Sequence, residues 1–405
     1  MRLDRMLPNH IELPAPPASI DLTRFPTHGS VYALTDASDQ LIQLSASEDL
    51  RRAIGTRLCT GEEDRKRRRA DLRAVTRHVR YVSTFSQFET MFVFHRWARQ
   101  LMPRAYRDQI AFGPAWFAQV NPDDALPRFA ATSSPFEKPG TAIGPFHGRN
   151  VCARFIELIE DLFDLCRHYD ILQKTPDGQP CAYFEMGKCP APCDGSIPLS
   201  RYRRMVSSAA AFAAGQREPF RQDLRDQMQQ AAEKLEFERA AVLKQALERT
   251  DKVEAKSYRL ARPAEFFSFL IVQRAGGRSR VKPFYVHRGN ITPGREVTGK
   301  HLEAAARRWV RRATAETHRE RPVDPVYRAE QAWLVSHFLF KQDHVPGLYL
   351  AAETLPDPPR LADLMRETFK LSGGRKSPTA HRDVDENAPD LTVRSASDRT
   401  RDAAR

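Results

Sequence analysis

The chain has 405 residues, of which 41% are hydrophobic and 28% are charged, and its formal net charge is +13. This length allows two or three domains, each with a core of its own. No run of about 18 apolar residues occurs, so we expect no membrane span. The opening MRLDRMLPNHIELPAPPASIDL lacks the apolar centre of a secretory signal, and we expect a cytoplasmic protein with reduced thiols.

The positive charge favours a polyanionic partner such as nucleic acid, because basic side chains release the counterions of phosphates. Part of the excess lies in RKRRRADLRAVTRHVR, a segment with helical composition. We expect DNA contact through its basic run, although a solvated helix face would have the same composition. The run consists of Arg65, Lys66, Arg67, Arg68 and Arg69.

The N-terminal third predicts a small α/β unit over residues 25–110, after an irregular leader at 1–24. Apolar and polar residues alternate in GSVYALTD and LIQLSAS, as they do in short strands. The apolar residues of EDLRRAIGTRL have the spacing of a helix. A basic helix is expected at about 62–77, and a strand near VRYVSTF. A further helix over 87–101 stops before Pro103.

Residues 111–218 predict short strands, a helix at about 150–164, an irregular cysteine-rich segment, and a helix at RYRRMVSSAAAFAAG that Gly215 ends. Residues 219–256 predict a pair of helices with a break near LEFERA. The apolar stripe of this pair is narrow, so the pair needs a partner surface, inside the protein or outside it.

The last part of the chain divides into an ordered region and a polar tail. Two or three strands are expected within 264–293, helices at about 299–318 and 325–341, and a strand at GLYLAAE. Residues 371–405 are polar and poor in large apolar side chains, which is typical of disorder. The expected fold class is therefore α+β with a helical hairpin and a disordered tail.

The stretch CAYFEMGKCPAPC holds three of the six cysteines of the chain. A metal site, a disulfide, a redox pair or packing of small side chains would each account for them. Reducing conditions disfavour the disulfide. Gly187, Pro190 and Pro192 indicate a tight loop, which favours metal binding over packing. Cys59 and Cys152 stand alone and read as packing residues.

Four blocks in this order resemble the UvrC family of bacterial excinucleases: GPFHGRN, LFDLCRHY, QPCAYFEMGKCPAPCDGSI and LEFERAAVLKQAL. The resemblance covers residues 25–255 and weakens over 260–365. It implies a GIY-YIG nuclease domain at 25–110, a GPF block with a cysteine segment at 111–218, and a UVR hairpin at 219–256. Residues 260–370 would be a remnant of the family's RNase H-like half. The FDISH-type and DGGKGQ-type blocks of that half do not occur here, so its incision activity should be absent.

The resemblance also implies a metal centre at the cysteine segment. Cys181, Cys189 and Cys193 match three family ligands, and either Cys166 or His168 would supply the fourth. Four thiolates would favour an iron–sulfur cluster, whereas three thiolates and an imidazole would suit zinc. Its role would be to hold the loop between the nuclease-like domain and the hairpin.

A GIY-YIG nuclease holds one divalent ion with a Glu, and uses two Tyr, a Lys and an Arg around the phosphate. Here only Tyr32 stands at a matching position. The other family positions have become Gln43 for the second Tyr, Ser45 for a Gly, Ala46 for the Lys, Ala53 for the Arg and Phe94 for the metal-binding Glu. Alanine and phenylalanine cannot bind a metal ion or carry charge, so we expect a domain that has lost catalysis.

An active enzyme would need replacements, with Glu89 as the ligand of Mg²⁺ or Mn²⁺ and Arg51 or Arg52 as the phosphate clamp. Glu89 lies five residues before Phe94, about 140° away around a helix, which argues against this role. The simpler interpretation makes these three residues a solvated helix surface and Tyr32 a core residue.

The UVR resemblance implies that UvrB is the partner of the hairpin. The contact residues would be Leu235, Phe237, Glu238, Ala240, Ala241 and Leu243. We therefore expect a UvrC-like repair protein that binds UvrB and damaged double-stranded DNA without cutting it. The alternatives are a short UvrC homologue that makes a 3′-side incision, and a DNA-binding accessory factor unconnected to UvrB.

Overall fold

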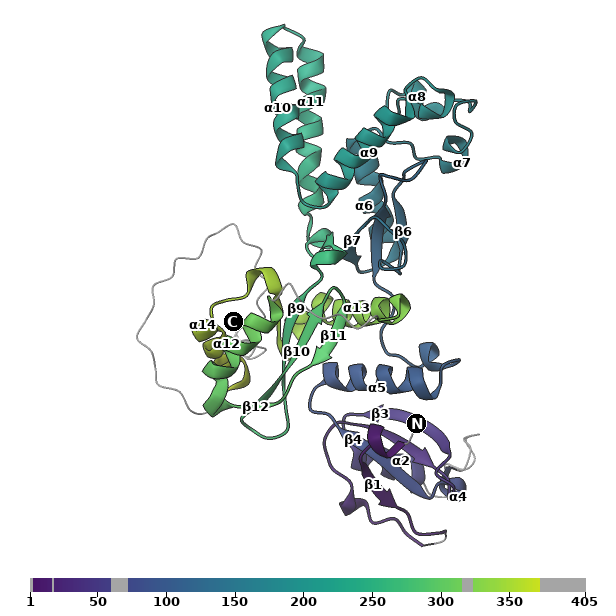
Figure 1. Cartoon of the computed structure of the whole chain (residues 1–405), viewed down its shortest axis with the longest axis vertical. Coiled ribbons are helices and arrows are strands. Elements are labelled where there is room, and N and C mark those ends of the chain that lie inside the picture. The colour runs from purple at the N-terminus through teal and green to yellow at the C-terminus, as the bar shows by residue number, and fades with distance from the viewer. Residues whose placement is uncertain (1–2, 17, 60–71, 315–322, 372–405) are drawn as a thin grey trace, which may run out of the picture.

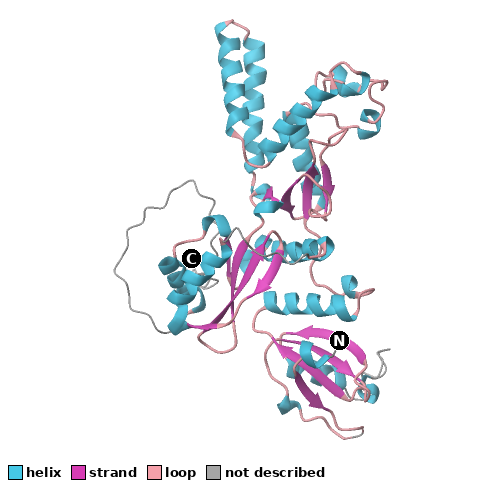
Figure 2. Ribbon diagram, in the orientation of Figure 1, coloured by secondary structure: helices cyan, strands magenta, loops and turns pink. Residues whose placement is uncertain are grey.

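The computed structural model describes residues 3–16, 18–59, 72–314 and 323–371. Figures 1 and 2 show an elongated molecule with strands gathered in separate sheets and a helical hairpin that projects from one end. Every strand pair among the described residues is antiparallel, so the molecule is α+β, as expected. No helix in these ranges is long and apolar enough to cross a membrane.

The N-terminal sheet has the strand order β1-β4-β2-β3. Its strands are β1 (Asn9–Glu12), β2 (Ser30–Thr35), β3 (Leu41–Ser47) and β4 (His78–Ser83). The helices α1 (Leu3–Met6), α2 (Leu50–Leu58) and α4 (Leu72–Val75) accompany them. The expectation of an irregular leader at 1–24 is wrong, because β1 pairs with β4 and buries Ile11 and Leu13 on alternate positions.

Helix α5 (Gln87–Leu101) is packed on two sides. Phe94 and Ala98 lie in a core with residues of β2 and β3. On another side, Phe88 contacts Phe284 and Phe338, with ring centroids 5.1 and 5.2 Å apart. The N-terminal unit and the C-terminal region therefore share this helix, which lies between them in Figure 1.

The middle unit contains a sheet in the order β6-β5-β7-β8. Its strands are β5 (Trp116–Val120), β6 (Ala130–Thr132), β7 (Thr141–Phe146) and β8 (Arg262–Pro263). Its helices are α6 (Arg149–Leu162), α7 (Tyr169–Leu172), α8 (Ala182–Glu185) and α9 (Leu199–Ala213). Gly215 follows α9 with φ of 111°, the left-handed conformation expected of a glycine that ends a helix.

The hairpin consists of α10 (Glu218–Glu233) and α11 (Phe237–Thr250). Its base is fixed to the middle unit, where the ring of Phe220 stacks on Phe163 at 4.2 Å. Arg221 also donates hydrogen bonds to Thr250 at 3.0 Å and to Asp251 at 2.9 Å. The far end of the hairpin extends away from the rest of the molecule (Figure 1).

The C-terminal unit is a sheet covered on both faces. Its strands are β9 (Phe269–Arg274), β10 (Arg280–His287), β11 (Asn290–Pro293), β12 (Val297–Thr298) and β13 (Leu348–Ala351). Phe269 and Ile271 pack with α13 (Pro325–Phe340). Leu270 and Val272 pack with α12 (Leu302–Ala313) and α14 (Pro358–Phe369).

The sequence predicted β9, β10, β11 and β13 and the first two helices of this unit, whereas β12 and α14 were not anticipated. Nearly all of the tail predicted to be disordered lies outside the described residues.

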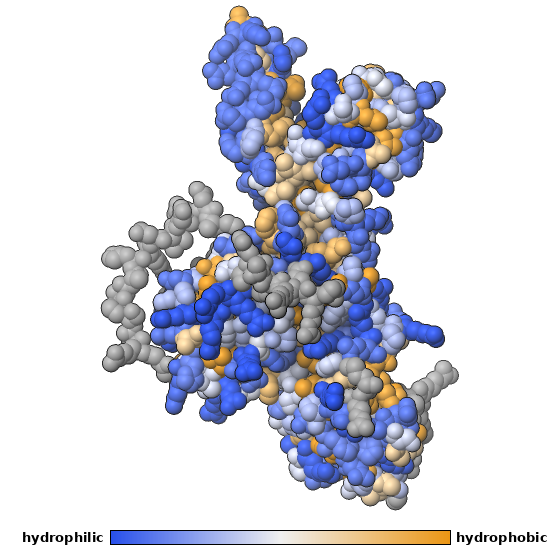
Figure 3. Space-filling view, in the orientation of Figure 1, coloured by the Kyte–Doolittle hydropathy of each residue, from blue (hydrophilic) through white to orange (hydrophobic). Residues whose placement is uncertain are grey.

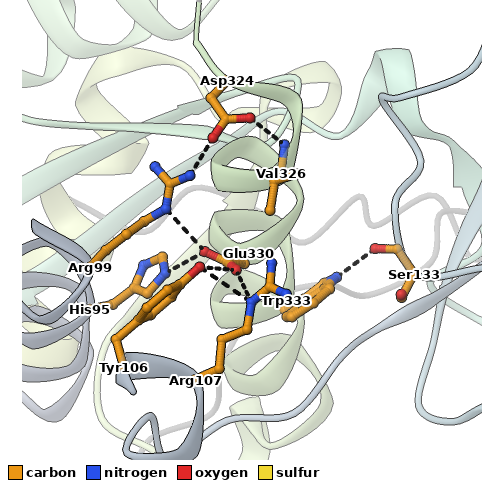
Figure 4. Close-up of polar contacts among 9 residues, drawn as sticks. All are labelled: His95, Arg99, Tyr106, Arg107, Ser133, Asp324, Val326, Glu330 and Trp333. Atoms are coloured by element: carbon orange, nitrogen blue, oxygen red, sulfur yellow. Dashed lines mark hydrogen bonds and ion pairs between the residues drawn. The ribbon is translucent and has the colours of Figure 1, made fainter. Parts of the chain in front are cut away.

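Glu330 of α13 links the C-terminal unit to α5 and the segment that follows it (Figure 4). Its buried carboxylate accepts hydrogen bonds from Tyr106 at 2.7 Å and Arg107 at 2.9 Å, and pairs with His95 Nε2 at 3.0 Å. Burial alone would raise the pKa of Glu330, but the hydrogen bonds from His95 and Tyr106 outweigh it and hold the pKa below its usual value. Arg99 on α5 pairs with Asp324, the residue that caps α13.

We predict that Glu330→Gln lowers the free energy of unfolding by about 3–5 kcal/mol, because His95 and the arginines lose a buried counter-charge. Since the folded-state pKa is lowered, the carboxylate stabilises the fold above its usual pKa of 4.5, and this contribution disappears as the pH falls through the folded-state value. The difference between the wild type and the variant should therefore shrink in acid. Urea unfolding at several pH values measures it.

The matched control is Glu367→Gln, since Glu367 has a 65% exposed side chain and a 3.9 Å pair with Arg360, whose side chain is 59% exposed. It should cost less than about 1 kcal/mol. Equal losses for the two variants would contradict the central role of Glu330.

Candidate functional site

A pocket of about 890 Å³ opens on the N-terminal unit between β3, the turn from β4 to α5, and residues 109–112. Four of the five substituted positions named above line it, three of them on β3 and one on α5. They are Gln43, Ser45, Ala46 and Phe94. The fifth, Ala53, packs against the core beneath the sheet. The structure therefore brings together most of the positions that the sequence comparison grouped.

The pocket has little capacity to hold a metal ion. Its inner wall is apolar and includes Met91, Phe94 and Phe112. The one carboxylate among its lining residues is that of Glu48, which is exposed. Among the described residues, no group of three or more Cys, His, Asp or Glu side chains could hold a metal ion.

Tyr32 lies in the core and does not line the pocket. Its side chain is fully buried, and the polar side chain that acts on its hydroxyl from the paired strand is that of Ser45. Burial raises the pKa of the Tyr32 hydroxyl, and the positive charge of Arg57 opposes the rise only in part. The Arg57 guanidinium lies 5.9 Å from the ring centre and also lines the pocket. The core interpretation of Tyr32 is therefore confirmed.

Glu89 lies neither in the pocket, where a metal ligand would be, nor on a solvated helix surface. It is 3% exposed, so the prediction of a solvated helix surface is wrong. Its carboxylate pairs with Lys282 of β10 at 2.6 Å and accepts a hydrogen bond from the Phe85 backbone at 3.0 Å. It does not line the pocket, because it lies on the side of α5 that faces the C-terminal sheet.

The two candidate arginines differ from each other. Arg51 donates to the backbone carbonyls of Phe25 at 3.0 Å and Thr23 at 3.2 Å, so it fixes the segment before β2 and is not a solvated side chain. Arg52 is exposed on α2, as predicted for a surface residue. Neither lines the pocket, where sequence reasoning missed Arg57 and His28. The basic run Arg65–Arg69 lies outside the described residues.

The cysteine segment is partly assembled. Cys166 and Cys189 lie side by side, and this proximity lowers the pKa of the Cys189 thiol while it raises that of the Cys166 thiol. The Cys166 thiol also donates to the backbone carbonyl of His168 at 3.5 Å. Cys193 is buried nearby, whereas Cys181 is partly exposed at the start of α8. His168 lies against the ring of Tyr183, with centroids 5.7 Å apart.

The hairpin presents large apolar side chains to solvent. Leu235 and Phe237, at the turn, are 71% and 67% exposed, and Val242 on α11 is 65% exposed. Figure 3 shows apolar atoms at the free end of the hairpin and along one of its sides. Among the residues named as contacts, Glu238 and Ala241 are exposed, and Ala240 and Leu243 are half-buried.

Comparisons with known proteins agree with this layout. Residues 115–212 match the model of the UvrC/Cho excinuclease middle domain, and residues 221–251 match the UvrB/uvrC motif. The chain is a UvrC-family protein. No solved structure matches it.

Several UvrC-family relatives carry the name UvrABC system protein C. That of Cereibacter sphaeroides is 26% identical over 261 residues, covering 63% of this chain and 41% of the relative. That of Caulobacter vibrioides is 24% identical over 362 residues, covering 88% of this chain and 53% of the relative. The chain therefore spans about half or less of the length of these relatives, and corresponds to the N-terminal half of the family.

The family matches fall on the middle unit and the hairpin, and not on the N-terminal unit that holds the pocket. In this UvrC-family chain, the retained features are thus a cysteine segment and a projecting hairpin. The substituted positions gather in the pocket, where the side chains are mainly apolar or uncharged.

Proposed function

We propose that this chain is a UvrC-like protein of nucleotide excision repair that docks on UvrB through the hairpin, binds DNA, and no longer cuts through its GIY-YIG-like domain. The observation that carries the proposal is the exposed apolar surface at the free end of a hairpin that matches the UvrB/uvrC motif. Surface of this kind is typical of a docking site.

The backbone at the hairpin turn supports a binding role. Leu235 has φ of 60°, a left-handed conformation that costs a residue with a Cβ about 1 kcal/mol and that glycine adopts freely. A leucine that is both strained and exposed contributes little to the fold of the hairpin. Its side chain is better explained by a contact with a partner.

The loss of cutting is supported by the chemistry of the pocket. A metal-dependent nuclease needs a metal ligand and positive charge around the phosphate, and each lost group costs about 10²–10³ in rate. Phe94 and Ala46 provide neither. Glu89 cannot replace the missing ligand without leaving Lys282 unpaired in the contact between α5 and β10.

We also propose that the cysteine segment binds zinc or an iron–sulfur cluster. The chemistry of the donors suits either group, because Cys166 and Cys189 lie side by side and the charge of Cys193 acts on Cys166. No set of three ligands is assembled among the described residues, so binding would have to draw the thiols together. Cys181, which lies at the start of α8, would have to approach this pair. A bound metal would fix the loop that leads from α6 to α9.

For the hairpin, we predict that Phe237→Ala weakens UvrB binding by roughly 30-fold. This is the effect expected of an aromatic side chain that becomes buried in the complex and contributes about 2 kcal/mol to binding. Leu235→Gly should weaken binding by roughly tenfold while leaving the fold as stable or more stable, because glycine removes the left-handed strain. Isothermal titration with purified UvrB and thermal unfolding measure the two effects.

The control for the hairpin variants is Gln230→Ala, an exposed side chain on α10. It should leave UvrB affinity unchanged. If the two hairpin variants bind as the wild type does, the docking proposal is wrong.

For the pocket, we predict no nicking of a damaged duplex in the presence of UvrA, UvrB and Mg²⁺ or Mn²⁺. Glu89→Gln should lower the stability of the chain, because Lys282 loses its partner, and should leave the nicking assay at background. Reproducible 3′-side nicking that Glu89→Gln abolishes would instead establish the active short homologue.

For the cysteine segment, we predict roughly one zinc ion or one iron–sulfur cluster per chain after anaerobic purification. Elemental analysis and the visible spectrum distinguish the two. Cys189→Ser should remove the metal, whereas Cys59→Ser, on an exposed cysteine elsewhere, should not. Metal-free wild-type protein would refute the site.

A further inference from the structure

Helix α12 lies outside the stretches that the two family models match, and it carries a basic face. Its inner face is apolar, and Leu302, Ala306 and Trp309 pack against the C-terminal sheet and α14. The opposite face carries exposed Arg307, Arg308 and Arg311. This division places the three arginines on the solvent side of a helix whose other face is buried.

The arginines line a groove of about 650 Å³ between α12 and α14. Five basic side chains line it, together with His301, Ala304 and a single carboxylate, Glu303. The five are Lys300, Arg307, Arg308, Arg311 and Arg366. Glu303 is already bound to Arg366 at 2.9 Å, so it does not neutralise the other four.

Within the described part of the chain, Arg307, Arg308 and Arg311 form no ion pair, unlike the arginines around Glu330 and at the base of the hairpin. Concentrating unpaired like charges costs free energy through their mutual repulsion. Figure 3 shows a hydrophilic surface over the part of the molecule that holds α12. Such a groove is suited to a ligand that brings several negative charges.

We propose that the groove between α12 and α14 binds the sugar-phosphate backbone of duplex DNA. Arg307 and Arg311 are one helical turn apart, about 6 Å along the axis, which is close to the axial rise of two nucleotides on one strand. Guanidinium groups bind phosphate oxygens in a planar, two-pronged geometry. The inference rests on the proposed DNA binding of this chain and gives it a location.

The lining favours duplex over single-stranded DNA. Single strands bind by stacking their bases on aromatic side chains, and apart from the imidazole of His301 the groove offers none. Trp309 faces the core and is 4% exposed. The contacts would therefore be to the backbone, without base readout, and would hold the duplex without choosing its sequence.

The test compares the full chain with a triple variant, Arg307→Gln with Arg308→Gln and Arg311→Gln, by fluorescence anisotropy on a fluorescent duplex over a range of salt concentrations. Each lost phosphate contact removes about 0.9 from the slope of log K against log salt, so the slope should fall by roughly 2–3 and affinity by on the order of 100-fold at 0.1 M salt. A single strand of equal length should bind less tightly than the duplex.

The control is a second triple variant at exposed arginines away from the groove, with Arg104, Arg201 and Arg204 changed to Gln. It has the same net charge and should keep the wild-type slope. UvrB titration with both variants should be unchanged, since the hairpin is intact. Loss of DNA binding with UvrB binding retained would therefore assign the effect to the groove and leave the docking proposal standing.

Three outcomes would overturn the inference. They are equal salt slopes for the groove variant and the control variant, no duplex binding by the wild-type chain, and displacement of the duplex by polyglutamate of equal charge as readily as by unlabelled DNA. The last outcome would indicate an acidic protein as the partner of the groove.

Discussion

The structure depends on helix α5 being buried on two sides at once. One side carries Phe94 and Ala98 into the core of the N-terminal sheet, and another carries Phe88 and Phe92 into the core beneath the C-terminal sheet. The apolar contacts supply most of the stabilisation of this joint, because they remove large aromatic side chains from water. Glu330 fixes its register, since a buried carboxylate must find its donors in one arrangement.

This constraint also bears on the chemistry of the pocket. The side of α5 that faces the pocket ends in the apolar ring of Phe94, and Glu89 is turned toward Lys282 on the other unit. A carboxylate in that position stabilises the joint and is withdrawn from any phosphate that enters the pocket. The arrangement supports the proposal that this domain does not cut DNA and serves as a structural support.

Two other parts of the molecule, the hairpin and the C-terminal unit, expose surfaces suited to binding. The hairpin is fixed at its base by the stacked rings of Phe163 and Phe220, and carries exposed Leu235 and Phe237 at its free end. On the C-terminal unit, α12 exposes a basic face. In the proposed function, the hairpin surface would hold the protein partner and the basic groove would hold the nucleic acid.

The sequence by itself determined the local elements and the family. Helices over 87–101 and 325–341 and the hairpin could be read from spacing and helix-forming residues, because these signals are local. The ordered blocks around GPFHGRN and LEFERAAVLKQAL sufficed to place the chain among UvrC proteins.

Only the tertiary structure decided which core each face of α5 packs against. The partners of Glu89 and Glu330 lie about 190 and 220–235 residues away in sequence. The spacing of apolar residues along the chain predicts local elements and does not predict ion pairs at such separations. The basic face of α12 likewise became visible only when Trp309 and Leu302 were seen to be buried, which left the arginines on the outside.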